Sequence, residues 1–196
     1  MTRKASIDRK TSETKIHLSL DVDGRGTSTI VTGIGFFDHM LTLFAKHGLF
    51  DLEVEAEGDL QVDYHHTVED VGIVLGQAFA KALGDKAGIH RYGTFYVPMD
   101  EVLVRAVIDL SGRPYLAYDV PPSVEPVGGN FSFQLVEEFL RAFTTNIAAN
   151  VHVSILAGRD AHHMAEGVFK ALARAVDVAT SHDSRVIGVP STKGLL

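Results

Sequence analysis

The stretch His65-His66-Thr67-Val68-Glu69 decides how this chain is organised, because the same pattern recurs as His162-His163-Met164-Ala165-Glu166. Each copy follows a short strand-like run and opens a segment whose apolar residues have helical spacing. On a helix, a His and a Glu three or four residues apart share one face and can bind one cation. Adjacent His side chains point about 100° apart around the helix axis. Each His pair is therefore better shared between two metal ions than closed on one.

The composition is that of a soluble globular protein. The 196 residues are 45% hydrophobic and 22% charged, which is enough apolar material for a sizeable core. The net charge of −7 argues against a nucleic-acid-binding protein. The absence of cysteine excludes thiolate ligands, so any metal must bind nitrogen and oxygen. The first residues have no apolar signal core, and no run is long enough to cross a membrane, so we expect a cytoplasmic protein with no membrane partner.

Hydrophobic periodicity predicts one order of elements that occurs twice. In the first half we expect strands at 3–9, 14–22, 27–32 and 52–56, and helices at 36–46, ending at Gly48, and 65–83. In the second half we expect strands at 92–97, 102–110, 115–120 and 151–156, a loop at 121–129, and helices at 131–149 and 162–180. The tail from residue 181 has no periodicity.

The predicted fold class is therefore α+β, a tandem pseudo-repeat of two βββαβα halves. Residues 1–90 form the first half, and residues 91–196 form the second half with the C-terminal tail, together as one compact unit. Each half is expected to be a four-stranded sheet with two helices on one face. Because such a half leaves apolar surface uncovered, the halves should pack helix layer to helix layer or assemble into oligomers.

Aligning the halves adds two candidate ligands in the shorter helices, His39 in the first half and Glu138 in the second. Pseudo-twofold symmetry then predicts two metal sites. One would combine His39 and His66 with His162 and Glu166, and the other Glu138 and His163 with His65 and Glu69. Such a donor set suits Mn, Fe, Co or Zn, and its carboxylates without sulfur favour Mn or Fe.

Five separated motifs carry a resemblance to a known family. They are the residues 33–41 (GIGFFDHML), 63–70 (DYHHTVED), 111–115 (SGRPY), 162–171 (HHMAEGVFKA) and 190–194 (PSTKG). In this order they resemble the monofunctional form of imidazoleglycerol-phosphate dehydratase, an enzyme of histidine biosynthesis. Many family members have a His where this chain has Glu138. The resemblance implies a lyase that dehydrates imidazole glycerol phosphate to imidazole acetol phosphate, with two divalent metal ions per site, Mn²⁺ expected. It also implies a homo-oligomer of 24 subunits with metal sites at subunit contacts.

The chemistry needs several further groups. An imidazolate stabilised by two cations can expel the hydroxyl group on the neighbouring carbon. The diazafulvene-like intermediate that remains then loses a carbon-bound proton. The resemblance implies that Glu13 is the catalytic acid–base and contacts substrate, although alone it would be interpreted as a solvated hairpin residue. Glu69 and Glu166 are predicted as catalytic carboxylates as well as ligands. The resemblance also implies phosphate contacts and two residues near the substrate, namely Arg91, Arg113, Ser191 and Lys193 for phosphate, with Asp100 and Lys170 nearby.

Two other function classes remain open from the residues alone. The same ligands would serve a dimetal hydrolase or oxygenase, or a protein that stores metal or uses it to hold an assembly together. The cations Arg91, Arg113 and Lys193 distinguish these classes, because a storage protein has no need of a phosphate site.

Overall fold

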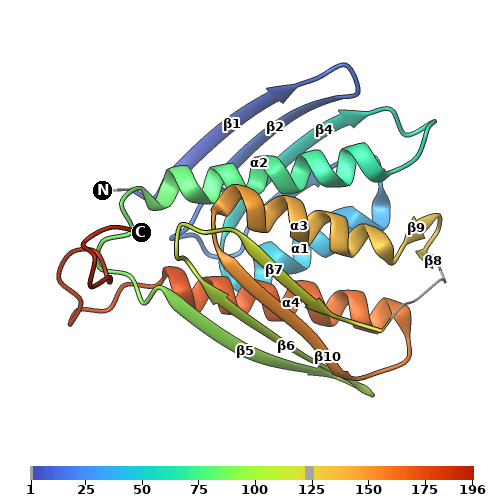
Figure 1. Cartoon of the computed structure of the whole chain (residues 1–196). Helices are drawn as coiled ribbons and strands as arrows, with labels where there is room; N and C mark the ends of the chain where they lie inside the picture. The colour runs from blue at the N-terminus through green and yellow to red at the C-terminus, as the bar shows by residue number, and fades with distance from the viewer. Residues whose placement is uncertain (1, 122–125) are drawn as a thin grey trace.

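Residues 2–121 and 126–196 are described by the structure, a computed structural model of the chain. Two four-stranded sheets form the outer layers, and four helices lie between them (Figure 1). The elements of the first half are β1 (Lys4–Lys10), β2 (Thr14–Asp21), β3 (Ser28–Val31), α1 (Gly35–Gly48), β4 (Asp51–Gly58) and α2 (His65–Leu83). Those of the second half are β5 (Tyr92–Met99), β6 (Val102–Asp109), β7 (Tyr115–Asp119), β8 (Pro126–Gly128), β9 (Phe131–Ser132), α3 (Gln134–Ile147), β10 (Asn150–Ala157) and α4 (Ala161–Thr180).

The two sheets have the same topology, with strand orders β1-β2-β4-β3 and β5-β6-β10-β7. In each sheet the first two strands and the central pair are antiparallel, while the last strand is parallel to its neighbour. The predicted α+β fold with two four-stranded sheets is confirmed, and the matching strand orders show that the two halves repeat one topology.

Strand alternation explains which sheet face the helices cover. In β2 the buried residues include Ile16, Leu18 and Leu20, and in β6 they include Val104 and Ala106, with polar or partly exposed neighbours between them. Because successive side chains point to opposite faces, one face of each sheet turns inward onto the helices. That inner face and the helices share a single apolar core.

The helix layers of the two halves pack against each other, as the uncovered apolar surface of a single half predicts. Helix α2 contacts α3 of the other half, and α1 contacts α4. Gly72 allows α2 to approach α3 closely, because a Cβ there would lie 2.8 Å from the Phe139 carbonyl oxygen and 2.9 Å from the Ala142 Cβ. Stacked and edge-on phenylalanines, including Phe79 and Phe143, fill the space between the layers.

Three local predictions need correction or restriction. The expected loop at 121–129 contains β8, which pairs with β9, and residues 122–125 of that loop lie outside the described residues. The second-half short helix begins at Gln134 and not at residue 131, because 131–132 belong to β9. Helix α1 includes Gly48, and the left-handed residue that ends it is Leu49, with φ of 59°. Ala148 ends α3 in the same conformation, so the helix ending is repeated as well.

None of the helices in the described residues is long and apolar enough to cross a membrane.

Candidate metal centre and active site

The first turns of α4 carry the best-defined cluster of donor atoms. Asp160 caps the helix by accepting a hydrogen bond from the His163 backbone N–H at 2.9 Å. His162 and Glu166 lie one turn apart on one face, and His39 reaches them from α1 of the other half. The Nε2 atoms of His39 and His162 each lie 3.1 Å from the Glu166 Oε1. One donor atom from each of the three residues lies within 4.8 Å of the others.

The charge state of Glu166 suits a cation site. Its side chain is buried, and burial opposes ionisation. Hydrogen bonds from Lys170, His39 and His162 outweigh that effect and lower the pKa of Glu166 to about 2. The Lys170 Nζ lies 2.5 Å from the Glu166 Oε2, opposite the imidazoles. Two imidazole nitrogens and an ionised carboxylate oxygen converge here, a donor set that fits a divalent transition metal.

A second, related group lies at the start of α2. His65 and Glu138 line one cavity of about 250 Å³, together with Asp63 and Tyr64. Glu69 follows His65 by four residues on α2, as Glu166 follows His162 on α4. In both groups the short helix of one half brings a candidate ligand to the long helix of the other half, His39 to α4 and Glu138 to α2.

The remaining histidines of the two pairs point elsewhere within the chain. The Nδ1 of His66 lies 3.0 Å from the Asp59 Oδ2, and the Nδ1 of His163 lies 3.1 Å from the Glu101 Oε2. These hydrogen bonds to a carboxylate raise the pKa of each histidine. The same contact with His163 lowers the pKa of Glu101 to about 2. We predicted that His66 would join His39, His162 and Glu166. Within one chain, His66 instead contacts Asp59, and the other three residues form the cluster.

The other predicted substrate residues at this end surround the first turns of the long helices. Glu13 lies in the turn between β1 and β2, half-exposed, with its Oε2 3.9 Å from the His66 Nδ1. Asp100 lies in the β5–β6 turn with φ of 48°, and Lys170 contacts Glu166. Catalytic and metal-binding candidates thus gather where α2 and α4 begin.

The four residues predicted to contact phosphate lie together at the opposite end of the folded molecule, near the end of α4. Arg91, Arg113, Ser191 and Lys193 line one open cavity of about 1070 Å³. Asp109 holds the Arg91 guanidinium at 2.7 Å and raises the pKa of Arg91, and the Pro190 carbonyl oxygen accepts a further hydrogen bond at 2.9 Å. The C-terminal tail therefore lies against the start of β5 and the loop that follows β6, although these segments come much earlier in the sequence.

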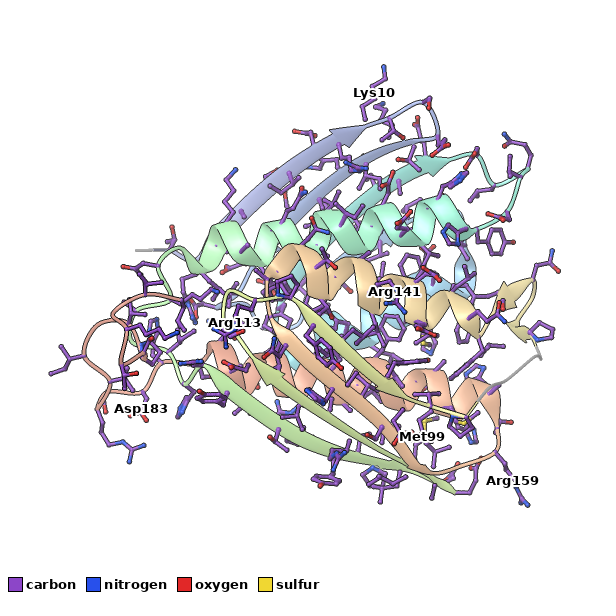
Figure 2. The ribbon with its side chains drawn as sticks, in the orientation of Figure 1. Lys10, Met99, Arg113, Arg141, Arg159 and Asp183 are labelled. Atoms are coloured by element: carbon purple, nitrogen blue, oxygen red, sulfur yellow. The ribbon has the colours of Figure 1, made fainter. Side chains whose placement is uncertain are left out.

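The two ends are separated by the length of α4. The Arg91 N–H donates to the Ala179 carbonyl oxygen at the last turn of α4, whereas His162 lies in its first turn. Seventeen residues of helix span about 25 Å. Figure 2 shows Arg113 toward one end of the molecule and Arg159, next to the start of α4, at the other.

A sequence model of the family described as imidazoleglycerol-phosphate dehydratase matches residues 32–176. The chain belongs to the imidazoleglycerol-phosphate dehydratase family. The imidazoleglycerol-phosphate dehydratase of Thermoanaerobacter pseudethanolicus is 62% identical over 194 residues, which are 99% of this chain and 100% of that protein. The one from Acetivibrio thermocellus is 58% identical over the full length of both.

Solved structures of imidazoleglycerol-phosphate dehydratase have the same fold. The crystal structure of the Staphylococcus aureus enzyme superposes with a TM-score of 0.81 at 40% identity, covering 92% of this chain and 99% of that one. The Pyrococcus furiosus structure gives 0.80 at 34% identity, covering 97% and 100%.

Family membership establishes the reaction class: the chain is a hydro-lyase that dehydrates imidazole glycerol phosphate, a small molecule, in histidine biosynthesis. The rival interpretations as a hydrolase, an oxygenase or a storage protein are thereby set aside. The sequence did not point to two carboxylates beside the candidate site, Asp59 against His66 and Glu101 against His163. Alignment of the repeat could have found Glu101, because it occupies the same hairpin turn in the second half that Glu13 occupies in the first.

Proposed function

We propose that this dehydratase works with two divalent metal ions per site, with Mn²⁺ as the expected metal, and that each site is assembled from more than one copy of the chain. The observation that carries the proposal is the convergence of His39, His162 and Glu166, which offers a cation two imidazole nitrogens and an ionised carboxylate. The carboxylate-containing donor set without sulfur favours Mn or Fe among the transition metals.

The pseudo-repeat supplies the residues for two ions. His39, His162 and Glu166 would hold one, and Glu138, His65 and Glu69 the other. His66 and His163 have their Nδ1 atoms engaged by carboxylates within the chain. Their Nε2 atoms would serve as ligands to the sites of neighbouring copies. When bound, two cations at the ring nitrogens would stabilise the substrate's imidazole as an anion and so ease loss of the adjacent hydroxyl.

Glu13 is the proposed acid–base. The reaction breaks a carbon–oxygen bond and a carbon–hydrogen bond, releases water, and leaves an enol that becomes the ketone. One positioned carboxyl group can protonate the departing hydroxyl and accept the carbon-bound proton. Glu13 is half-exposed in a hairpin turn, within 3.9 Å of His66, and is therefore open to a bound substrate. Glu166 and Glu69 would act through the cations, and Asp100 and Lys170 would line the same space.

Phosphate binding falls to Arg91, Arg113, Ser191 and Lys193, which line one cavity. Arginine forks and a lysine ammonium suit a phosphate dianion. Asp109 fixes the Arg91 fork, while Arg113 and Lys193 remain exposed. Because about 25 Å of helix separates this cavity from the metal donors, one small substrate cannot reach both in one chain. The proposed phosphate end of one copy would then meet the proposed metal end of another, which supports an oligomer, while the number of 24 subunits rests on the resemblance alone.

The direct test is turnover of imidazole glycerol phosphate by chelator-stripped protein with and without added Mn²⁺. We expect imidazole acetol phosphate only after the metal is restored. Full turnover by the stripped protein would refute the metal requirement.

Sharing of the site between copies has its own test, in which two impaired variants are combined and assayed at a substrate concentration far below KM. Glu13→Gln removes the acid–base at one end of the chain, and Arg113→Ala weakens the phosphate cavity at the other. If the two variants are unfolded, mixed and reassembled, random mixing should restore up to about a quarter of the wild-type sites. Each variant reassembled alone is the control. No recovery in the mixture would show that the site lies within one chain.

A further inference from the structure

The repeat places two glutamates in equivalent turns, and they have different surroundings. Glu13 lies between β1 and β2, and Glu101 lies between β5 and β6, the matching strands of the two sheets. Glu101 contacts its histidine directly, with its Oε2 3.1 Å from the His163 Nδ1. Glu13 stands back, with its Oε2 3.9 Å from the Nδ1 of His66. The two halves therefore share the histidine and the turn glutamate but not the hydrogen bond between them.

Asp59 accounts for the difference. Its two carboxylate oxygens lie 3.0 and 3.2 Å from the His66 Nδ1 and so occupy the hydrogen bond that Glu101 makes in the second half. Its backbone N–H also donates to the Glu13 carbonyl oxygen at 3.1 Å, which ties it to the hairpin turn.

The position that corresponds to Asp59 in the second half is Gly158. Asp59 directly follows β4 and Gly158 directly follows β10, and these two strands occupy the same position in their sheets. A Cβ at Gly158 would lie 2.8 Å from the Val102 Cγ2, and the glycine has a φ of 144°. No carboxylate can replace Glu101 from this position, so the turn glutamate is needed there.

Glu101 is itself firmly held. Its Oε1 accepts a hydrogen bond at 3.0 Å from the Asp160 backbone N–H, and the Asp160 carboxylate caps α4 through the His163 N–H at 2.9 Å. The Glu101 carboxylate thus holds the His163 ring and the Asp160 carboxylate holds its backbone, and a hydrogen bond from the Asp160 backbone N–H joins the two acidic residues.

We propose that Asp59 and Glu101 are positioning residues, which hold the rings of His66 and His163 with the proton on Nδ1 and the Nε2 lone pair free for a metal ion. In the first half Asp59 has taken over this role from the turn glutamate, and this leaves the Glu13 carboxylate free to transfer protons. A neutral imidazole carries one N–H, and the hydrogen bond at one nitrogen decides which nitrogen can bind a metal. The inference rests on the proposed function in so far as His66 and His163 are taken as ligands and Glu13 as the acid–base.

Solid-state NMR of metal-free protein with ¹⁵N-labelled histidine tests the ring state without metal or activity. The spectra are recorded above the titration range of histidine, and His66→Gln and His163→Gln variants assign the two signals. We expect both rings to carry the proton on Nδ1. In Glu101→Ala, the His163 ring should shift toward the form protonated on Nε2, and in Glu101→Gln, whose amide oxygen can still accept the bond, it should not. Glu57→Ala, which removes an exposed carboxylate that faces Lys15, is the matched control.

Metal affinity gives the second readout, measured by calorimetric titration of metal-free protein with Mn²⁺. Loss of such an outer carboxylate typically weakens metal binding about 10–100-fold. We expect this loss in Glu101→Ala and Asp59→Ala, recovery in Glu101→Gln, and no change in Glu57→Ala. Asp59→Ala should also lower kcat more than KM rises, because Glu13, 3.9 Å from His66, can then take the place of Asp59 on that ring.

The outcomes separate the two levels of proposal. Rings protonated on Nε2 in the wild type, or an unchanged His163 ring and Mn²⁺ affinity in Glu101→Ala, would overturn the positioning roles even if the enzyme is fully active with metal. A wild-type enzyme that needs no metal would overturn the proposed function, while the ring states would still report on Asp59 and Glu101.

Discussion

Gly72→Ala tests whether the close approach of α2 and α3 holds the second metal group together. Gly72 lies against α3 next to Glu138, and its new Cβ would meet the Phe139 carbonyl oxygen at 2.8 Å and the Ala142 Cβ at 2.9 Å. Ordinary contact begins near 3.4 Å, so the helices must move apart by about 0.6 Å. His65 is carried by α2 and Glu138 by α3, and the movement would separate these two proposed ligands.

Two opposing effects determine the stability change. Overpacking a close contact costs about 1–3 kcal/mol. Replacing a helical glycine by alanine contributes about 1 kcal/mol in favour of the helix. The free energy of unfolding should therefore fall by about 1 kcal/mol, because the carbonyl of Phe139 belongs to a helix backbone and cannot rotate away.

The assay combines denaturant unfolding of the metal-free protein with Mn²⁺ titration. We expect the second metal-binding event to weaken, whereas binding at His39, His162 and Glu166 is retained because α1 and α4 carry that cluster. Gly35→Ala is the control for the added methyl group, since Gly35 is the first residue of α1 and its Cβ would meet no atom within 4 Å. A Gly72→Ala protein as stable as Gly35→Ala, with both ions bound normally, would refute the reasoning.

Three further predictions follow from the site and its surroundings. Arg113→Ala and Lys193→Ala should each raise KM about 10-fold or more while metal content stays unchanged, and a normal KM in both would refute the phosphate assignment. His39→Ala should lower Mn²⁺ content measured by elemental analysis, whereas His90→Ala, on a half-exposed ring outside the donor cluster, should not. Hydrogen bonds from two backbone amides lower the pKa of Asp51, so its contribution to stability is present above about pH 4 and is lost as the pH falls. The stability difference between wild type and Asp51→Asn should accordingly vanish in acid unfolding curves.

The fold was predictable because every level of the sequence points to the same repeat. Alternating residues in β2 and β6, helical spacing after each HHxxE pentad and the turns between them recur in the same order, and both sheets adopt one topology. The short hairpin of β8 and β9 was not predictable, because Phe131 and Phe133 fit the spacing of the helix that follows. Periodicity reports which residues face the core, and it cannot separate a buried two-residue strand from a first helical turn.

The site was predictable in part. The pseudo-twofold relation correctly joined His39 to His162 and Glu166, because each short helix crosses to the long helix of the other half. It did not predict that His66 and His163 turn to Asp59 and Glu101. Helical spacing gives the angle between two adjacent histidines, but it does not predict which loop or turn residue contacts the second histidine of each pair. Nor could motif order along the chain show that the proposed phosphate residues lie a full helix away from the proposed metal donors.

The two ends of α4 hold their proposed ligands against the helix dipole. His162 and Glu166 lie in its first turns, where the dipole is positive and disfavours a cation, and Arg91 borders its last turn, where the dipole is negative and disfavours an anion. Each unfavourable term is about 0.3–1 kcal/mol. The ionised Glu166 offsets it at the first end, and the guanidinium groups of Arg91 and Arg113 offset it at the second. We therefore expect side-chain charge, and not the helix dipole, to determine which proposed ligand binds at each end. Neutralising Glu166 should lower metal affinity, because the neutral donors His39 and His162 cannot replace its charge.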